Sequence, residues 1–131
     1  MRKILVVDDE KPCLSLLQWH LQRNGYEVLT AMNGDEALKV LEKHSVDLVI
    51  TDIIMPGKDG LETIRDIRKR WPTLKVIAIS GGGMCGTGLY TTLSLKLGAA
   101  LVMNKPFTSE ELLQAVTANL PSAECAEAAA A

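Results

Sequence analysis

The chain has 131 residues, enough for one domain with a single core, and its hydrophobic fraction of 47% with only 4% aromatic residues predicts aliphatic packing. Fourteen basic residues against sixteen acidic ones give a formal net charge of −2, which argues against a nucleic-acid partner. No apolar run has the length of a membrane span or a secretory signal, and the spacing of Cys13, Cys85 and Cys125 does not suit a metal site. We therefore expect a cytoplasmic protein with reduced thiols and no membrane contact.

The first predicted element is a buried strand at residues 4–7, a continuous apolar run that ends on Asp8 and Asp9. Leucines then recur at helical spacing after Pro12, a residue that suits the first turn of a helix. Asn24 and the glycine after it end this pattern. The start of the chain thus predicts a strand, a pair of acids and a helix.

The next strand and helix are expected at residues 26–30 and from Asn33 onward. Residues 26–30 mix polar and apolar side chains, which is typical of an edge strand with one exposed face. Asn33 followed by Glu36 predicts a capped helix start. A third strand, apolar and buried on both faces, follows at residues 48–50 and leads directly to Asp52.

Turn residues at positions 55–60 separate Asp52 from a third predicted helix, whose outer side carries basic residues that we expect to be solvated. An apolar strand at residues 76–79 ends on the hydroxyl of Ser80. Leucines at four-residue intervals predict a fourth helix that stops at Gly98.

A last short strand is predicted at residues 101–103, and it leads to Lys105 and Pro106. Thr108 and Glu111 form a capping-box pattern before the final helix, which Pro121 closes. The alanine-rich residues 121–131 are too small in their side chains to bury a core, so we expect one domain over residues 1–120 and a short tail without a domain of its own.

Five strands separated by helices predict an α/β fold, with a parallel sheet covered by helices on both faces. The functional groups of such a sheet gather at the carboxyl ends of its strands. In this sequence those ends carry Asp8 with Asp9, Asp52, Ser80 and Lys105.

Carboxylates that converge at one edge repel one another, so the cluster requires a counter-charge. Mg²⁺ suits a set of oxygen ligands that leaves room for water and phosphate, and Lys105 supplies a second positive charge. A carboxylate can also act as a nucleophile toward phosphorus and form an acyl phosphate. The pattern therefore favours Mg²⁺-dependent phosphoryl transfer to an aspartate.

These residues resemble the receiver domain of two-component response regulators, in its stand-alone form. The resemblance rests on Asp8-Asp9, on Asp52 followed by Met55-Pro56 and Asp59-Gly60, on Ser80, and on Lys105-Pro106-Phe107, and it covers residues 1 to about 120. It implies a flavodoxin-like (βα)5 fold, doubly wound, with five parallel strands in the order 2-1-3-4-5.

The resemblance also implies a role for each of these positions. Asp52 would be the phosphoacceptor, and Asp9, Asp52 and the backbone carbonyl of Ile54 would bind Mg²⁺ directly, with Asp8 acting through water. Lys105 would contact the phosphoryl group, and the peptide bond between Lys105 and Pro106 would be cis.

Two further positions complete the implied switch. Ser80 would be the hydroxyl that moves toward the phosphoryl group, and the small Gly81 would leave that group accessible. Phosphorylation would then shift the population of two surface arrangements, read on the fourth helix, fifth strand and fifth helix.

The implied partners are a histidine kinase or histidine phosphotransfer protein, which donates the phosphoryl group, and a downstream effector protein. The chain would act as a phosphoacceptor rather than a turnover enzyme, as a monomer or as a phosphorylation-dependent dimer. The kinase, the output pathway and the place of the chain in a relay do not follow from the sequence.

The sequence departs from the family pattern at two places. Val102 stands where the family usually has an aromatic residue that reports the state of the switch hydroxyl. Residues 81–88 contain five glycines, and we expect a mobile loop there, with the fourth helix starting near Thr87.

Three other classes of protein share part of this pattern. A pseudo-receiver would share the fold but act only as an unphosphorylated interaction module. Gly81, Gly83 and Gly86 match a dinucleotide-binding pattern, but the acid that would bind the ribose is missing. A phosphatase of the haloacid-dehalogenase type needs two aspartates separated by one residue, whereas Glu10 stands two positions after Asp8.

Overall fold

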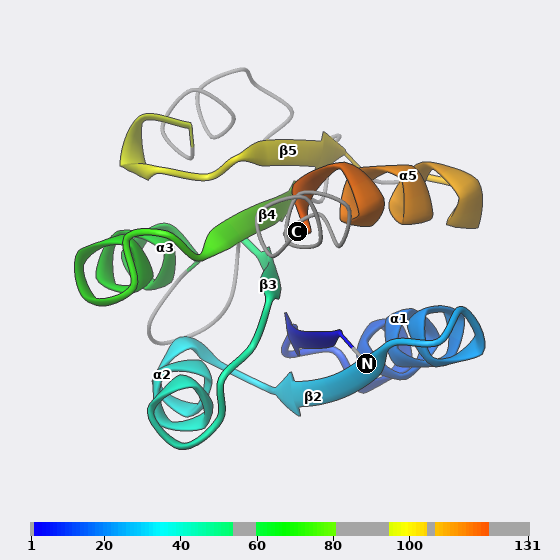
Figure 1. Cartoon of the computed structure of the whole chain (residues 1–131), viewed down its shortest axis with the longest axis horizontal. Coiled ribbons are helices and arrows are strands. Elements are labelled where there is room, and N and C mark those ends of the chain that lie inside the picture. The colour runs from blue at the N-terminus through cyan, green and yellow to red at the C-terminus, as the bar shows by residue number, and fades with distance from the viewer. Residues whose placement is uncertain (1, 54–59, 81–94, 105–106, 121–131) are drawn as a thin grey trace, which may run out of the picture.

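The computed structural model describes residues 2–53, 60–80, 95–104 and 107–120. Within these ranges five parallel strands form one sheet in the order β2-β1-β3-β4-β5, which confirms the predicted flavodoxin-like fold and places β2 at an edge (Figure 1). The strands are β1 (Lys3–Val7), β2 (Glu27–Ala31), β3 (Leu48–Asp52), β4 (Lys75–Ser80) and β5 (Leu101–Asn104).

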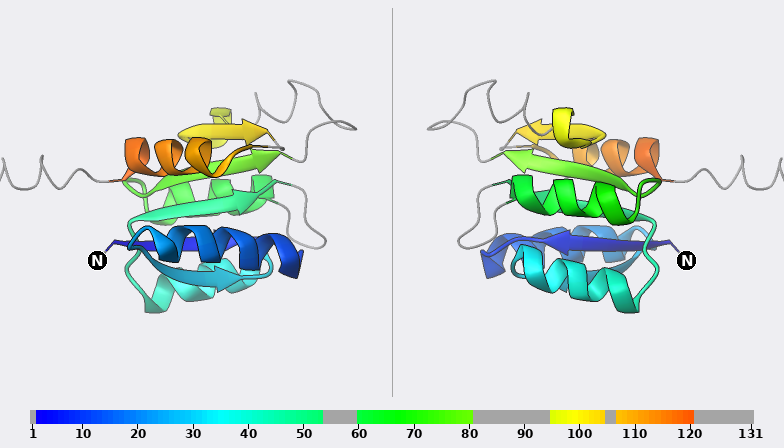
Figure 2. Two further views of the ribbon diagram at one scale, coloured as in Figure 1. Left: turned by 90° about the vertical axis from the view of Figure 1, so that its right-hand side faces the viewer. Right: turned by 90° about the vertical axis from the view of Figure 1, so that its left-hand side faces the viewer.

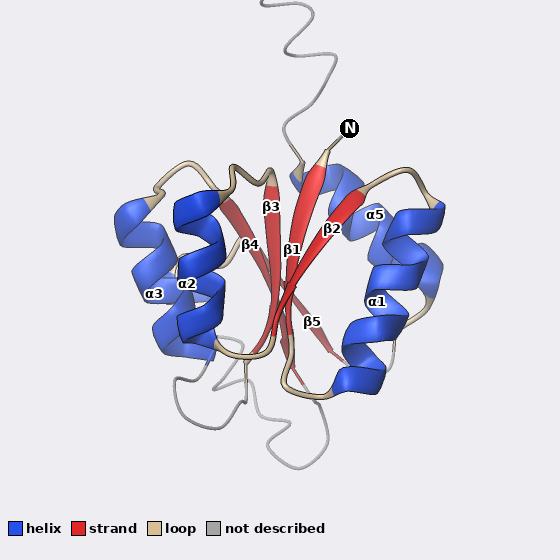
Figure 3. Ribbon diagram, turned by 90° about the horizontal axis from the view of Figure 1, so that it is seen from below, coloured by secondary structure: helices blue, strands red, loops and turns tan. Residues whose placement is uncertain are grey.

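Helices cover both faces of the sheet. They are α1 (Lys11–Arg23), α2 (Gly34–Lys43), α3 (Gly60–Arg70) and α5 (Ser109–Asn119). Figure 3 shows α1 and α5 on one face and α2 and α3 on the other, and Figure 2 shows the same layers from two sides. Residues 95–97 are helical and agree with the predicted end of a fourth helix, but its predicted start and the glycine-rich loop at residues 81–88 lie outside the described residues.

The strands divide their side chains between two aliphatic clusters, because successive residues of a strand point to opposite faces. Ile4, Val6, Leu48 and Ile50 pack under α1 and α5. Their neighbours Leu5, Val7 and Val49 pack under α2 and α3. Every residue of β3 is buried, as a central strand covered on both faces requires.

The predicted helix signals are confirmed wherever the structure describes them. Asn33 accepts a hydrogen bond from the backbone N–H of Glu36 at 2.8 Å, and Thr108 and Glu111 form the complete capping box. Gly98, with a φ of +117°, follows the end of the fourth helix in a left-handed conformation that favours glycine.

The expectation that the basic residues of α3 only face solvent is wrong for Arg68. Its Nη1 donates a hydrogen bond to the backbone oxygen of Leu74 at 2.8 Å. Its methylene groups lie over Gly98, so that a Cβ atom at Gly98 would meet the Cδ of Arg68 at 2.8 Å. Arg68 therefore joins the end of α3 to the turn before β5, because a long basic side chain can pack its stem while its charged end bonds elsewhere.

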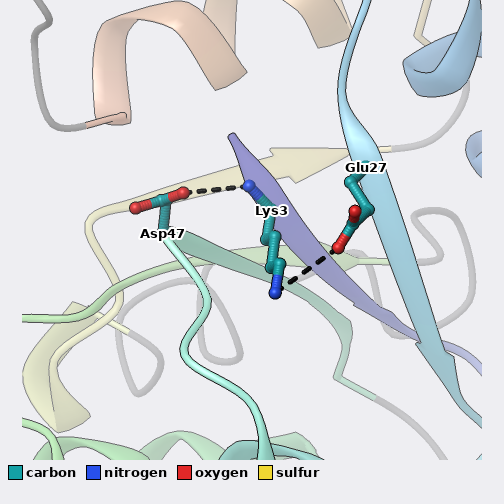
Figure 4. A network of polar contacts seen from close by, with 3 residues as sticks. All are labelled: Lys3, Glu27 and Asp47. Atoms are coloured by element: carbon teal, nitrogen blue, oxygen red, sulfur yellow. Dashed lines mark hydrogen bonds and ion pairs between the residues drawn. The ribbon is translucent and has the colours of Figure 1, made fainter. Parts of the chain in front are cut away.

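A small polar network holds the strands at the opposite edge from their carboxyl ends (Figure 4). The backbone N–H of Lys3 donates to Asp47 Oδ2 at 2.9 Å, and the Lys3 ammonium lies 3.6 Å from Glu27 Oε2. These contacts join the start of β1 to the chain before β3 and to β2. In the described part of the chain, no helix is long and apolar enough to cross a bilayer.

Candidate functional site

Two of the predicted acids lie at the same level on neighbouring central strands. Val7 of β1 pairs with Thr51 of β3, so Asp8 and Asp52, the next residues, continue the same register. Adjacent strands are about 4.8 Å apart. Asp8 and Asp52 are both buried, with 1% and 6% exposure, which places two carboxylates at the carboxyl edge of the sheet.

Backbone contacts fix the orientation of Asp8. Its own N–H donates to the oxygen of Ala31 at 3.1 Å, which extends the contact between β1 and β2 by one residue. Its Oδ1 accepts a hydrogen bond from the N–H of Glu10 at 3.0 Å, a local arrangement that aspartate favours in turns. The Asp8 side chain is therefore held over the start of α1.

The ligand oxygens of Asp8, Asp9 and Glu10 all lie within 4.8 Å of one another. Asp9 is partly buried and Glu10 is exposed. Glu10 was not among the predicted ligands, although its position directly after two aspartates could have indicated that it lies beside them. An all-oxygen set of this kind suits a hard divalent cation such as Mg²⁺ rather than zinc.

Two backbone hydrogen bonds join the end of β3 to its neighbours, and a third hydrogen bond lies within the strand. The N–H of Ile53 donates to the oxygen of Ile79 at 3.0 Å, one step beyond the paired residues of β3 and β4. The N–H of Gly60, at the start of α3, donates to the oxygen of Ile53 at 2.7 Å. The Thr51 hydroxyl donates to the backbone oxygen of Asp52 at 3.1 Å. Asp52 thus sits on a backbone held by both β4 and α3.

Ser80 lies at the same edge on the other side of β3. It is the last residue of β4, it is buried at 8% exposure, and it follows Ile79, whose neighbour across the sheet is Met103. Ser80 itself pairs in register with Asn104, the residue before Lys105. The structure therefore brings Asp8, Asp9, Asp52 and Ser80 to one edge.

The remaining predicted site residues lie outside the described residues. They are Ile54, Gly81, Lys105 and Pro106. Val102 is described: it lies in β5, it is partly buried, and it packs against the cluster under α2 and α3. An aliphatic side chain thus occupies the position at which the sequence departs from the family pattern.

The α1 helix exposes two large apolar side chains that the sequence pattern did not single out. Leu16 is 56% exposed and Trp19 is 51% exposed, and the Arg23 guanidinium lies 4.6 Å from the centre of the Trp19 ring. Leu16 also borders a groove of about 260 Å³ between α1 and α5. Both residues fall outside the buried stripe of Leu14, Leu17 and Leu21, and that spacing could have revealed them.

Comparison with known proteins shows the family of this chain. The family model of the response regulator receiver domain matches residues 4–117. The chain belongs to this family. Receiver domains act in two-component signal transduction, so this fold belongs to a signalling domain.

Solved structures of other receiver domains resemble this one closely. Response regulator TrrA from Thermotoga maritima, in a complex with Mg²⁺-BeF, is 41% identical, with a TM-score of 0.81 over 92% of this chain and 100% of that one. The receiver domain of NtrX from Brucella abortus is 34% identical, with a TM-score of 0.83 over 89% and 97% of the two chains. Chemotaxis protein CheY4 from Vibrio cholerae is 30% identical, with a TM-score of 0.85 over 92% and 99%.

Proposed function

We propose that this receiver domain accepts a phosphoryl group on the carboxylate of Asp52, from a histidine kinase or a histidine phosphotransfer protein, and thereby changes the surface it offers to a downstream effector. The observation that carries the proposal is the position of Asp52. It ends the central strand, level with Asp8 on one neighbouring strand and close in register to Ser80 on the other.

The transfer itself needs a nucleophile and a leaving group. A carboxylate oxygen of Asp52 attacks the phosphorus of a phosphohistidine, a P–O bond forms, and the P–N bond breaks with its electron pair going to the imidazole nitrogen. Little covalent chemistry remains for the protein, so positioning and charge neutralisation dominate. The rigid end of β3 supplies the positioning.

The acids at this edge fit a Mg²⁺ ion. Asp8, Asp9 and Asp52, with the backbone carbonyl of Ile54, would hold it, and the proximity of the Asp8 and Asp9 oxygens supports this assignment. Mg²⁺, when bound, neutralises negative charge on phosphoryl oxygens. Lys105 would add a second positive charge from the chain itself. The Mg²⁺-BeF complex of the Thermotoga protein supports the proposal by analogy.

The switch would use the hydroxyl of Ser80, which donates a hydrogen bond to a phosphoryl oxygen and draws the chain after β4, including Gly81, toward the site. Phosphorylation then favours this arrangement over the other. The same proposal includes a cis peptide bond before Pro106 and a cytoplasmic location. The chain would act as a phosphoacceptor rather than a turnover enzyme, as a monomer or a phosphorylation-dependent dimer. It would form one domain over residues 1–120, followed by a tail at residues 121–131.

The proposal is tested by phosphorylation with a small donor. The wild-type chain, Asp52→Asn and Asp47→Asn are incubated with acetyl phosphate with and without Mg²⁺, and intact masses are measured before and after hydroxylamine treatment. Asp47 is a control aspartate at the opposite edge of the sheet. We expect a Mg²⁺-dependent, hydroxylamine-labile phosphoryl adduct on the wild type and Asp47→Asn only.

The same experiment distinguishes a phosphoacceptor from a pseudo-receiver. If no adduct forms with acetyl phosphate or with purified histidine kinases, the chain acts as a pseudo-receiver, and the acids serve a different contact.

A further inference from the structure

The first residue of α3 lies against the backbone that ends β3. Gly60 is buried, and its N–H donates to the oxygen of Ile53 at 2.7 Å. Ile53 and Gly60 are the two described residues that flank positions 54–59. This hydrogen bond therefore joins the two ends of the segment that contains Ile54.

A side chain at position 60 would have no space. A Cβ atom there would overlap the backbone oxygen of Asp52, and it would lie 2.5 Å from the Cα and 2.8 Å from the oxygen of Ile53. All three atoms belong to the backbone, so no side-chain rotation can relieve the overlap. Gly60 is not among the described glycines with positive φ, so the requirement for glycine here comes from space alone.

We propose that Gly60 is a positioning residue for the phosphoacceptor site: because it has no side chain, the start of α3 can contact the backbone of Asp52 and Ile53 directly. Because Ile53 is also bonded to Ile79 of β4, this backbone is held from two sides. The inference rests on the proposed function, because the group that is positioned is the Asp52 carboxylate.

A side chain at position 60 must push apart α3 and the end of β3. The N–H of Ile53 is bonded to β4, so the displacement falls on the contact between Ile53 and Gly60. Asp8 and Asp9 follow β1 and are not moved directly. The metal ligands that follow β1 and the ligand at the end of β3 would then no longer lie at the right distances to bind the same ion. We therefore expect a larger effect on Mg²⁺ affinity than on the stability of the fold.

The matched control is Gly25→Ala. Gly25 has a φ of +89°, and no atom lies within 4 Å of the place that a Cβ would take, so alanine there strains the backbone without a clash. Gly25 lies in the turn between α1 and β2, at the other edge of the sheet. Gly25→Ala therefore shows how a loss of stability alone affects Mg²⁺ binding.

Mg²⁺ binding is measured by titration calorimetry for the wild type, Gly60→Ala and Gly25→Ala, below the melting temperature of each. We expect Mg²⁺ to bind Gly60→Ala roughly tenfold or more weakly, the size of effect seen when groups that orient metal ligands are changed. Gly25→Ala should bind as the wild type does. Wild-type affinity in folded Gly60→Ala would overturn the inference.

A second measurement uses the wild-type chain, so it tests the inference even if Gly60→Ala does not fold. If the contact at Gly60 supports Mg²⁺ binding, then bound Mg²⁺ must stabilise that contact by the same factor. We expect Mg²⁺ to slow hydrogen exchange at the Gly60 and Ile53 amides, measured by NMR, but not at the Glu27 amide, which is bonded to Arg2 at the far edge. Unchanged exchange at Gly60 would overturn the inference.

The two proposals fail in different ways. Absence of Mg²⁺ binding and of an adduct in the wild type would overturn the proposed function and this inference together. A wild type that binds Mg²⁺ and forms the adduct, beside a Gly60→Ala chain that does both equally well, would overturn the inference alone.

Discussion

At the scale of single residues, burial decides which polar contacts matter. In the network of Figure 4, Asp47 accepts a hydrogen bond from a part-buried backbone N–H, whereas Glu27 forms an ion pair with an ammonium whose side chain is 38% exposed. Removing the acceptor of a part-buried N–H costs more free energy of unfolding than removing one partner of an exposed ion pair.

We therefore expect Asp47→Ala to lower the free energy of unfolding by about 1 to 2 kcal/mol. Glu27→Ala should lower it by less than about 1 kcal/mol, an effect that salt reduces further. Urea denaturation of both variants at low and high ionic strength checks this. Equal losses for the two variants would show that the backbone contact of Asp47 has no special weight.

Residue types at strand ends made the candidate site predictable. Asp8 directly follows β1, Asp52 and Ser80 are the last residues of β3 and β4, and parallel strands bring their carboxyl ends to one edge. The steric role of Gly60 and the packing of Arg68 on Gly98 were not predictable, because each depends on the distance between two elements. A sequence shows which residues have no side chain, but not which atoms approach them.

At the scale of elements, α1 starts beside the site, as α3 does. It begins at the edge to which the strand arrows point in Figure 2, directly after the acids that follow β1. Under the proposed function, a protein donor must bring its phosphohistidine to Asp52, so it must cover this edge. The exposed Leu16, beside the groove between α1 and α5, offers an apolar contact for such a donor.

We expect Leu16→Arg to slow phosphorylation by a phosphorylated histidine kinase roughly tenfold, the effect of losing one apolar contact of about 1.4 kcal/mol. Its rate with acetyl phosphate, which needs no docking surface, should be unchanged. Leu95→Arg is the matched control, because Leu95 is similarly exposed but lies outside α1, in the helical residues 95–97 before β5. Equal slowing by both variants would contradict a docking role for α1.

The helices were predicted well where a capping residue or a glycine marks their ends. Asn33, Thr108 and Gly98 each identify a boundary through a local interaction, so no tertiary information was needed. The exposed side chains of α1 illustrate the opposite case. Their helical spacing shows that they leave the buried stripe, but only the structure shows that α5 lies beside them.

At the scale of the whole molecule, the acids at the carboxyl edge link cation binding to stability. The Asp8, Asp9 and Glu10 oxygens lie within 4.8 Å of one another, and like charges at such separations repel. Binding of Mg²⁺ to the folded chain should therefore stabilise it by mass action.

A Mg²⁺ concentration ten times the dissociation constant should raise the free energy of unfolding by about 1.4 kcal/mol. Asp9→Ala should lose this increase and, without Mg²⁺, should be more stable than the wild type by up to about 1 kcal/mol, because one repelling charge is gone. Thermal unfolding of both chains, with and without Mg²⁺ at constant ionic strength, measures both effects. An Asp9→Ala chain that keeps the full Mg²⁺ effect would exclude Asp9 as a ligand.

The overall fold was predictable because its pattern repeats. In the described part of the chain a strand is repeatedly followed by a helix, and the right-handed crossover leaves few arrangements of parallel strands. The strand order itself came from the resemblance to the receiver family, since periodicity alone does not order the strands. The family match over residues 4–117 and the observed order agree with that resemblance.

The central claim is that Asp52, rather than Asp8 or Asp9, carries the phosphoryl group. The most direct measurement is reduction of the phosphorylated wild-type chain with borohydride, which converts an aspartyl phosphate to homoserine, followed by peptide mapping by mass spectrometry. We predict homoserine at position 52 alone, and only in samples phosphorylated with Mg²⁺ present. Homoserine at position 8 or 9, or at no position in a chain that has gained a phosphoryl group, would contradict the account.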